Sequence, residues 1–305
     1  MKKETVGTIL ALITAVISGF AIPVNKIFVV GMDPAVFTAV RALIIGLVFL
    51  MIAGFQSGFN FRKFKKVPSR HLLAIGVIGG GLAFLMYFTG LQLTTAGRAA
   101  FLHKTLPIYA GILGAIFLKE RIPKKHWYAL VVMLAGLFMI HFTRIPLSAW
   151  WANPGLGDVL VIGATILWAV ENTIARKVMR EGETNFVVSF SRMFIGAIVL
   201  FCAVFLMGKA DVLLSLSGQQ VANLFISTGV LFGYVFFWYW SIRHINVSKA
   251  TALLLVGPVI STLLGAWWLS EPVPFTQALG SVLILAGAVT VSRMKSSWQT
   301  SETGV

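Results

Sequence analysis

Five ionisable side chains lie inside long apolar runs of this sequence: Arg41, His103, Lys104, Glu171 and Arg192. Groups of this kind could form a buried ion pair, bind an anion or carry a proton. In a membrane they are rare, and they normally face a cavity or each other. What they do depends on the elements that hold them.

The composition predicts a membrane protein. Of 305 residues, 58% are hydrophobic and only 11% are charged, against roughly 25% in an average soluble domain. So few charges cannot cover a soluble surface, and so apolar a chain is not disordered. The net charge of +15 lies in short loops between apolar runs, so we expect no nucleic-acid partner.

Ten runs are long enough to cross a bilayer as helices, which needs about 20 apolar residues each. Long continuous runs favour helices over the short alternating segments of a β-barrel. We therefore predict an all-α membrane protein with ten transmembrane helices. The expected spans are 5–25, 34–54, 71–92, 96–118, 126–142, 157–178, 186–208, 219–242, 249–269 and 273–292.

Loop charges predict the orientation. With ten spans, one side holds both termini and most Lys and Arg residues, and the other side holds only Lys26, Arg98, Arg144 and Lys209. Positive loops stay in the cytoplasm. We therefore expect a multi-pass protein of the cytoplasmic (inner) membrane with both termini cytoplasmic and an uncleaved first span.

The sequence overlays on itself at an offset of 151 residues. Arg41 then meets Arg192, Pro107 meets Pro258, and Glu120 meets Glu271. We predict a first repeat (1–142), an external linker (143–156), a second repeat (157–293) and a polar cytoplasmic tail (294–305). Five spans per repeat make the repeats inverted copies, an arrangement of secondary transporters with a central cavity.

Glu171 and Arg192 are expected at the same depth on adjacent spans, each about seven residues from one face. An ion pair between them is geometrically possible. It could be structural and fix the two helices, or it could serve gating or coupling.

Arg41, Lys104 and His103 are expected nearer the outer face, where no carboxylate answers them. The two cations either snorkel to the interface or form a positive pocket for a substrate carboxylate or phosphate. His103 is a cavity or packing residue, and we assign it no proton-carrying role.

Aromatic residues suggest a wall for an organic ligand. Tyr234 and Trp238 lie on the eighth span, Tyr87 on the third, and Trp168 and Asn172 share a face of the sixth. We predict that these five, with His103 and Lys104, bind substrate. Lipid-facing aromatics are the alternative.

Three further features concern packing. Pro107 and Pro258 lie inside the expected fourth and ninth helices, as kinks or hinges that free the carbonyls four residues earlier. A stripe of small residues every four positions, from Gly7 to Gly19, allows a close helix contact that either only packs or also slides. Cys202 is expected to be a buried structural thiol.

The repeated motifs resemble those of the EamA family of the drug/metabolite transporter superfamily. They are Arg98-Ala99 to Pro107 with Leu118-Lys119-Glu120-Arg121, and Lys249-Ala250 to Pro258 with Leu269-Ser270-Glu271-Pro272. Trp168-Ala169 with Arg176 also resembles the first helix of such a repeat. The first repeat has Ser18-Gly19 and Lys26 there and lacks the tryptophan. The resemblance implies a ten-helix exporter or exchanger of small metabolites, often amino acids.

The preferred hypothesis is a secondary transporter that works by alternating access. The alternatives are a membrane-embedded enzyme using His103, Lys104 and Glu171, and a non-transporting receptor or scaffold. We predict no catalytic residues, metal or cofactor; the expected partners are a small-molecule substrate and the lipid bilayer. The sequence fits either a monomer or a homodimer. It does not specify the substrate, the direction of transport or its coupling to an ion.

Overall fold

The computed structural model describes residues 2–28, 31–57, 68–142, 155–268 and 270–296, and this part of the chain is all-helical. Most of the predicted linker and tail lies outside it. The helices are α1 (Lys3–Phe28), α2 (Pro34–Ser57), α3 (Ser69–Ala74), η2 (Ile75–Leu82), α4 (Ala83–Leu93), α5 (Ala96–His103), α6 (Leu106–Phe117), α7 (Lys124–Phe142), α9 (Leu156–Arg180), α10 (Asn185–Phe190), η3 (Ser191–Ile195), α11 (Gly196–Leu206), α12 (Ala210–Leu214), α13 (Gly218–His244), α14 (Val247–Leu253), η4 (Leu254–Val256), α15 (Gly257–Trp268) and α16 (Phe275–Ser292).

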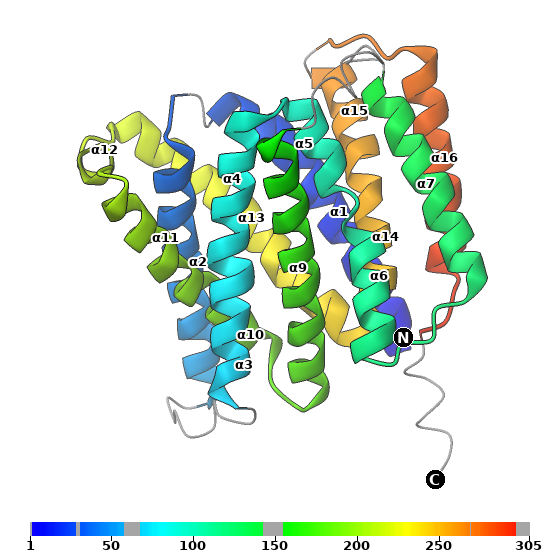
Figure 1. Ribbon diagram of the computed structural model, residues 1–305, viewed down its shortest axis with the longest axis horizontal. Coiled ribbons are helices and arrows are strands. Elements are labelled where there is room, and N and C mark those ends of the chain that lie inside the picture. The colour runs from blue at the N-terminus through cyan, green and yellow to red at the C-terminus, as the bar shows by residue number, and fades with distance from the viewer. Residues whose placement is uncertain (1, 29–30, 58–67, 143–154, 269, 297–305) are drawn as a thin grey trace.

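Nine helical stretches in the described residues are long and apolar enough to cross a membrane. They coincide with nine of the ten expected spans. The remaining expected span, 126–142, corresponds to α7, which has 19 residues and lies alongside α16 (Figure 1). That α7 crosses the membrane stays a prediction.

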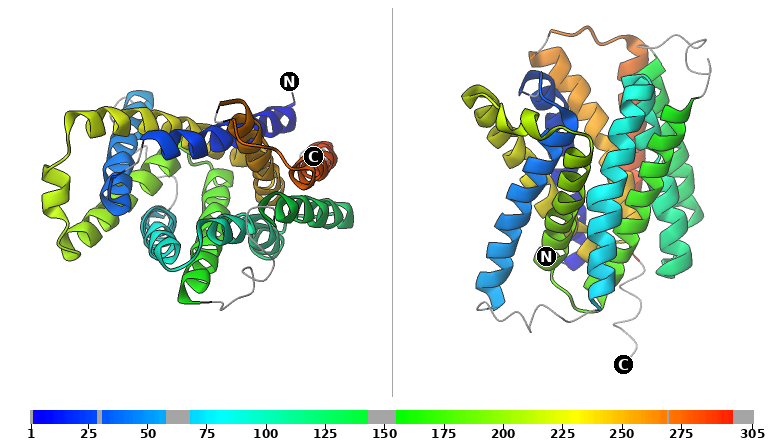
Figure 2. Two further views of the ribbon diagram at one scale, coloured as in Figure 1. Left: turned by 90° about the horizontal axis from the view of Figure 1, so that it is seen from above. Right: turned by 60° about the vertical axis from the view of Figure 1, so that its left-hand side comes forward.

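The helices run side by side as one bundle (Figures 1 and 2). α1 packs along α13, α4 packs along α9, and α2 packs on α10 and α11. The start of α1 and the end of α16 lie at the lower end of the bundle in Figure 1, which we call the terminal end. We call the other end the opposite end.

Side chains at several helix starts satisfy backbone N–H groups that have no partner within the helix. The Thr95 hydroxyl accepts a hydrogen bond from the N–H of Arg98 before α5. Thr184 does the same for Val187 before α10, and Ser217 for Gln220 before α13. These caps fix the points at which the chain turns back into the bundle.

The small-residue stripe of α1 gives the close contacts that its spacing predicts. Ala11 and Ala15 are fully buried. A Cβ on Gly7 would come within 2.8 Å of His244, and one on Gly19 within 2.8 Å of the Gly257 carbonyl oxygen. α1 therefore contacts α13 with one end and the start of α15 with the other.

The helical stretches 97–117 and 247–268 are each irregular just before their proline, and a hinge role for Pro107 and Pro258 stays a prediction. α5 ends at His103, and Pro107 lies in the first turn of the separate helix α6. Likewise η4, a turn of 3₁₀ helix, ends at Val256, and Pro258 lies in the first turn of α15. Proline suits a first turn because it has no N–H to leave unpaired there.

Two π-helical segments, η2 and η3, pack against each other. Their contact depends on glycine, because a Cβ on Gly80 would overlap the Arg192 carbonyl oxygen and one on Gly196 would overlap the Gly80 backbone. Such wide turns occur at functional sites, and here η3 carries Arg192.

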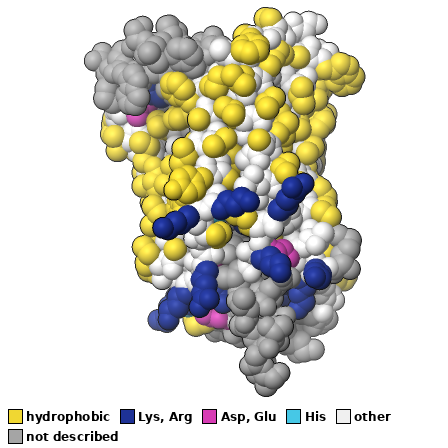
Figure 3. Space-filling view, turned by 90° about the vertical axis from the view of Figure 1, so that its right-hand side faces the viewer, with side chains coloured by type: hydrophobic (Ala, Val, Ile, Leu, Met, Phe, Trp, Pro, Cys, Tyr) yellow, Lys and Arg dark blue, Asp and Glu magenta, His cyan; other side chains and the backbone are white. Residues whose placement is uncertain are grey.

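Large apolar side chains, such as Phe55 and Trp267, are exposed on the outside of the bundle. Figure 3 shows a broad hydrophobic region on one face, with Lys and Arg side chains gathered towards the terminal end. Cys202 is exposed on α11, so the prediction of a buried thiol was wrong. An apolar run predicts insertion into lipid, but it does not tell which residues face the bundle interior.

Candidate functional site

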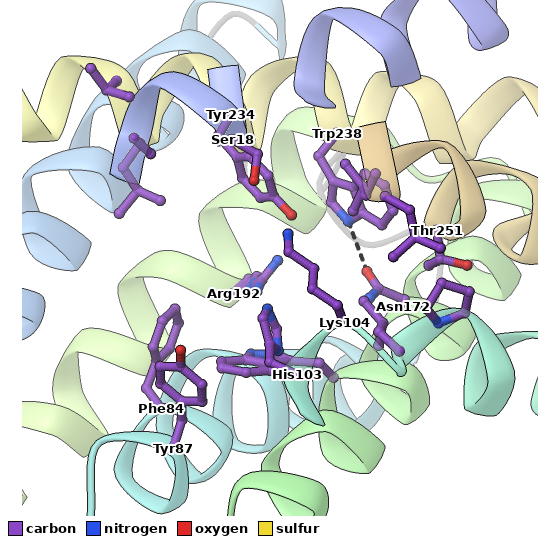
Figure 4. A pocket seen from close by; sticks show the side chains of 18 of the residues that line it. Ser18, Phe84, Tyr87, His103, Lys104, Asn172, Arg192, Tyr234, Trp238 and Thr251 are labelled. Atoms are coloured by element: carbon purple, nitrogen blue, oxygen red, sulfur yellow. Dashed lines mark hydrogen bonds between the residues drawn. The ribbon is translucent and has the colours of Figure 1, made fainter. Parts of the chain in front are cut away.

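A cavity of about 240 Å³ lies among the helices. A single water needs only about 10–15 Å³, so the space can hold a small organic molecule. Its wall comes from α1, α2, α4, α5, α6, α9, η3, α13, α14 and η4. Figure 4 shows these side chains converging on one space.

All seven residues predicted to bind substrate line this cavity: Tyr87, His103, Lys104, Trp168, Asn172, Tyr234 and Trp238. Arg41, Arg192 and Pro107 line it too, whereas Glu171 and Pro258 do not. The structure thus brings together residues from both predicted repeats. Their binding of substrate stays a prediction.

Glu171 and Arg192 form the ion pair that their depths predict. Arg192 Nη1 lies 3.8 Å from Glu171 Oε2, and the Glu171 side chain is fully buried. Tyr239 completes the group, since its hydroxyl donates to Glu171 Oε1 at 2.5 Å and accepts from Arg192 Nη1 at 3.3 Å. Whether this group gates the cavity remains a prediction.

A glycine in η2 makes room for Glu171. A Cβ on Gly79 would overlap the Glu171 side chain, so this carboxylate packs directly on the helix backbone. The Gly79 carbonyl oxygen accepts a hydrogen bond of 3.0 Å from Trp168 Nε1. η2 therefore positions both the buried carboxylate and an aromatic wall residue.

Aromatic rings form one side of the cavity. The Trp168 ring lies 4.8 Å from the His103 ring and 5.4 Å from the Tyr87 ring. Trp238 donates a hydrogen bond of 2.8 Å from its Nε1 to Asn172 Oδ1, drawn in Figure 4. These interactions hold the aromatic faces in fixed orientations.

Arg41 does not snorkel to the interface. Its residue surface is 7% exposed, its Nη1 donates to Ser227 Oγ at 2.8 Å, and its guanidinium carbon lies 3.9 Å from the centre of the Phe37 ring. Lys104 also lines the cavity, and in Figure 4 its side chain points into the same space as that of Arg192. Both cations therefore line the cavity, and that they bind a carboxylate or phosphate of the substrate stays a prediction.

Several lining residues were not predicted. They include the hydroxyl residues Ser18, Ser227 and Thr251 and the rings of Phe84 and Phe88. Helical spacing offers a partial signal for two of them, because Phe84 and Phe88 lie on the same face of α4 and bracket Tyr87. A lone hydroxyl in an apolar helix gives no signal, since it can also bond to its own backbone.

A second polar group lies at the terminal end. Glu120 Oε1 accepts from the N–H of Val247 at 3.2 Å, and Glu120 Oε2 accepts from the Ser248 hydroxyl at 3.4 Å. Arg176 Nε lies 3.9 Å from Glu120, and Arg176 Nη1 donates to the Ile242 carbonyl at 2.6 Å. We call these five residues the terminal-end cluster.

The terminal-end cluster joins the two predicted repeats, because Glu120 belongs to the first and its partners to the second. Burial raises the pKa of Glu120, and the nearby Arg176 opposes that shift without cancelling it. Close by on α14, Lys249 Nζ donates to Glu4 Oε1 at 3.1 Å and to the Met294 carbonyl at 2.6 Å. Both terminal segments are thereby attached to the start of α14.

At the opposite end the ion pairs are more exposed. Lys209 Nζ lies 2.6 Å from Asp33 Oδ2, and Arg98 Nη1 lies 2.9 Å from Asp158 Oδ2 at the start of α9. Burial raises the pKa of Asp33, but the hydrogen bonds from Lys209 and the Val36 N–H outweigh it and leave the pKa below its ordinary value.

The loops after α6 and α15 share an unusual local geometry. Lys119 and Ser270 both have left-handed backbones, with φ of 53° and 52°. The next residues, Glu120 and Glu271, donate their N–H groups to the Gly114 and Gly265 carbonyls at 3.1 and 3.0 Å. α5 and α14 also begin 151 residues apart, at Ala96 and Val247.

Comparison with known proteins points in one direction. The sequence model of the EamA-like transporter family matches residues 5–142 and residues 155–293. An uncharacterized transporter of Archaeoglobus fulgidus is 27% identical over 97% of this chain and 100% of its own length. The uncharacterized transporter YyaM of Bacillus subtilis is 23% identical over 85% of each chain. One solved crystal structure superposes with a TM-score of 0.77 at 18% identity, over 95% of this chain and 99% of the other, which shows a shared fold alone.

Proposed function

The chain belongs to the EamA-like transporter family, and from that premise we propose that it is a secondary transporter that exports or exchanges small metabolites by alternating access. The observation that carries the proposal is the cavity lined by both predicted repeats, with His103, Lys104, Tyr87, Trp168, Asn172, Tyr234 and Trp238 in its wall. A cavity with aromatic faces and a few convergent polar groups suits a small ligand.

We propose ten spans arranged as two inverted repeats, with α7 as the fifth. Two findings support this. The family model matches the chain in two parts of similar length, and the paired left-handed residues and helix starts recur at the same offset of 151 residues. An odd number of spans in each repeat reverses the direction in which the second one enters the membrane.

We propose that the protein lies in the cytoplasmic (inner) membrane with the terminal end facing the cytoplasm. The loops at that end hold most Lys and Arg residues, as the positive-inside rule requires. In that orientation, the terminal-end cluster closes the cytoplasmic side of the cavity, because Glu120 of the first repeat bonds to the start of α14 in the second.

Repeat symmetry specifies what replaces that closure in the other state. The residue that corresponds to Glu120 is Glu271, and the helix start that corresponds to Val247 is Ala96, the first residue of α5. When the cytoplasmic side opens, Glu120 leaves α14, while Glu271 and the start of α5 form the matching closure at the opposite end. The turn before Pro107 and the 3₁₀ turn before Pro258 are proposed as the hinges at which α5 and α14 move relative to α6 and α15.

Transport by purified protein in proteoliposomes tests the function. The panel comprises labelled amino acids, organic anions and cationic drugs. We expect saturable movement of at least one compound in the panel, faster when unlabelled substrate is present on the far side. If no compound in the panel moves, the proposal of transport is refuted.

Thiol cross-linking tests the two closures separately. On a Cys202→Ser background, one variant carries Glu120→Cys with Ser248→Cys, and its symmetry-matched partner carries Glu271→Cys with Gly97→Cys. We expect a short bifunctional thiol reagent to link each pair and to stop transport. Reporter fusions after residues 3 and 180 should lie in the same compartment; different compartments would contradict the proposed topology.

A further inference from the structure

The charges that line the cavity are of one sign. Arg41, Lys104 and Arg192 are in its wall, together with His103, and among the described lining residues there is no Asp or Glu. A transport site with this composition selects its substrate by charge. The number of these cations that have no carboxylate partner in the part of the protein that the structure describes therefore indicates the charge of the ligand.

Only one of the three cations has a carboxylate partner in the described part of the chain. Arg192 is matched by Glu171 at 3.8 Å. Among the described residues, the Arg41 guanidinium donates a hydrogen bond to the Ser227 hydroxyl and lies over the Phe37 ring, and its buried Nε has no hydrogen-bond partner there. The hydrogen bonds of Lys104 within the described chain come from its backbone N–H, to Ala100 and Phe101.

The positive charges of Arg41 and Lys104 are costly in this cavity unless an anion pairs with them, because taking an ion out of water costs several kcal/mol. A protein retains such charges where function needs them. A carboxylate or phosphate oxygen fits here, since it would accept charge-assisted hydrogen bonds from Arg41 and Lys104.

The remaining wall restricts the rest of the ligand. Phe84, Phe88, Tyr87 and Trp168 present apolar surface, which suits an aromatic or aliphatic body. An ammonium group would meet Arg41 and Lys104, which have no carboxylate partner in the described residues, and no lining carboxylate. A zwitterionic amino acid therefore fits this cavity worse than the same molecule without its amine.

We infer that the cavity binds a small organic anion, with a carboxylate or phosphate between Arg41 and Lys104 and an apolar body against the aromatic wall. The inference rests on the proposed transport function and narrows it. It disfavours the amino acids that the family resemblance suggests.

Compounds matched in their ring but not in charge provide the test. Binding to the purified full-length protein in detergent is measured for 3-phenylpropionate, L-phenylalanine, phenethylamine and phenyl phosphate. We expect 3-phenylpropionate or phenyl phosphate to bind at least about tenfold more tightly than phenylalanine, because phenylalanine keeps the carboxylate but adds an ammonium group close to Arg41 and Lys104, and like charges brought together in a binding site cost at least that much affinity. The two anions separate a carboxylate site from a phosphate site. Equal or tighter binding of phenylalanine or phenethylamine overturns the inference.

Variants locate the anion within the cavity. Lys104→Gln and Arg41→Gln should each weaken binding of the preferred anion at least about tenfold, and Lys104→Arg should retain most of it. The matched control is Lys177→Gln, which removes an exposed cation whose side chain is 51% accessible and should leave binding unchanged. Size-exclusion profiles identify any variant that fails to fold, and Lys104→Arg keeps the test usable in that case. Unchanged anion binding in both Gln variants overturns the inference.

Transport of the same compounds separates this inference from the proposed function. If only the amine-bearing compounds move, the protein is a transporter and the anion assignment fails. If the anions bind but no compound moves, the anion site stands and the proposal of transport fails.

Discussion

The terminal-end cluster and the cavity treat positive charge in opposite ways. At the terminal end, Arg176 is held by Glu120 and the Ile242 carbonyl, and Lys249 by Glu4 and the Met294 carbonyl. In the cavity, Arg41 has a hydroxyl and a ring, and Lys104 has no carboxylate partner in the described residues. In the proposed mechanism, the paired charges at the terminal end serve closure, and the cavity cations without a carboxylate partner bind the ligand.

The largest effect is expected at the terminal end. Glu120→Ala leaves the buried Arg176 without its carboxylate, and breaking a buried pair costs about 3–5 kcal/mol. We expect a marked fall in the thermal unfolding midpoint in detergent. The control is Glu181→Ala, whose side chain is 41% exposed beside Lys177 and should change stability by less than about 1 kcal/mol. Similar unfolding midpoints for Glu120→Ala and Glu181→Ala would mean that the pairing of Arg176 with Glu120 does not stabilise the terminal end.

Glu171→Gln tests the ion pair between Glu171 and Arg192 beside the cavity. The amide can still accept from Tyr239, but Arg192 loses its counter-charge, so we expect a loss of about 3 kcal/mol and a lower protein yield. Because removing both charges leaves neither one stranded, Glu171→Gln with Arg192→Met should recover part of that stability. Normal yield and thermal stability of Glu171→Gln alone would argue against a buried ion pair.

Lys104→Met should stabilise the protein, whereas the two variants above destabilise it. It removes a charge that lacks a carboxylate partner, so we expect a gain of about 1 kcal/mol in stability together with loss of anion transport, a common trade-off at functional sites. Thermal unfolding and transport are measured on the same preparation. A destabilised Lys104→Met would mean that this cation is already satisfied in the protein.

The smallest effect is expected at the opposite end. Lys209→Gln breaks a partly exposed pair with Asp33 and should cost no more than about 1 kcal/mol. Since the pKa of Asp33 is lower in the folded protein, its contribution is present above the ordinary carboxyl pKa and is lost as pH falls through the folded value. Lys209→Gln should therefore lower stability at neutral pH and make no difference in strong acid, in unfolding measured at both pH values.

The sequence predicted the ionisable, amide, tyrosine and tryptophan residues of the cavity wall better than its serine, threonine and phenylalanine residues. His103, Lys104 and Asn172 stand out because polar groups in apolar runs need partners or a cavity. Phe84, Phe88 and the exposed Cys202 could not be placed, because lipid is as apolar as the bundle interior and hydrophobicity then does not distinguish inside from outside.

Local backbone geometry was also beyond the sequence. Pro107 and Pro258 indicated disturbed helices, but not the form of the disturbance, which is a turn at residues 104 and 105 before Pro107 and a 3₁₀ turn, η4, before Pro258. The π-helical turns of η2 and η3 likewise arise where two glycine-containing helices cross at Gly80 and Gly196, and no local propensity predicts that crossing.

Hydrogen bonds to Gly79 and Asn172 hold the indole rings of Trp168 and Trp238, and the fluorescence of these two rings can report on the cavity. Both indoles border the cavity, so an occupant changes the polarity around fluorophores whose orientations the fold already fixes. Comparing emission from Trp168→Phe and Trp238→Phe would assign a spectral change to one wall or the other, and occupancy could be followed in time without attaching a dye.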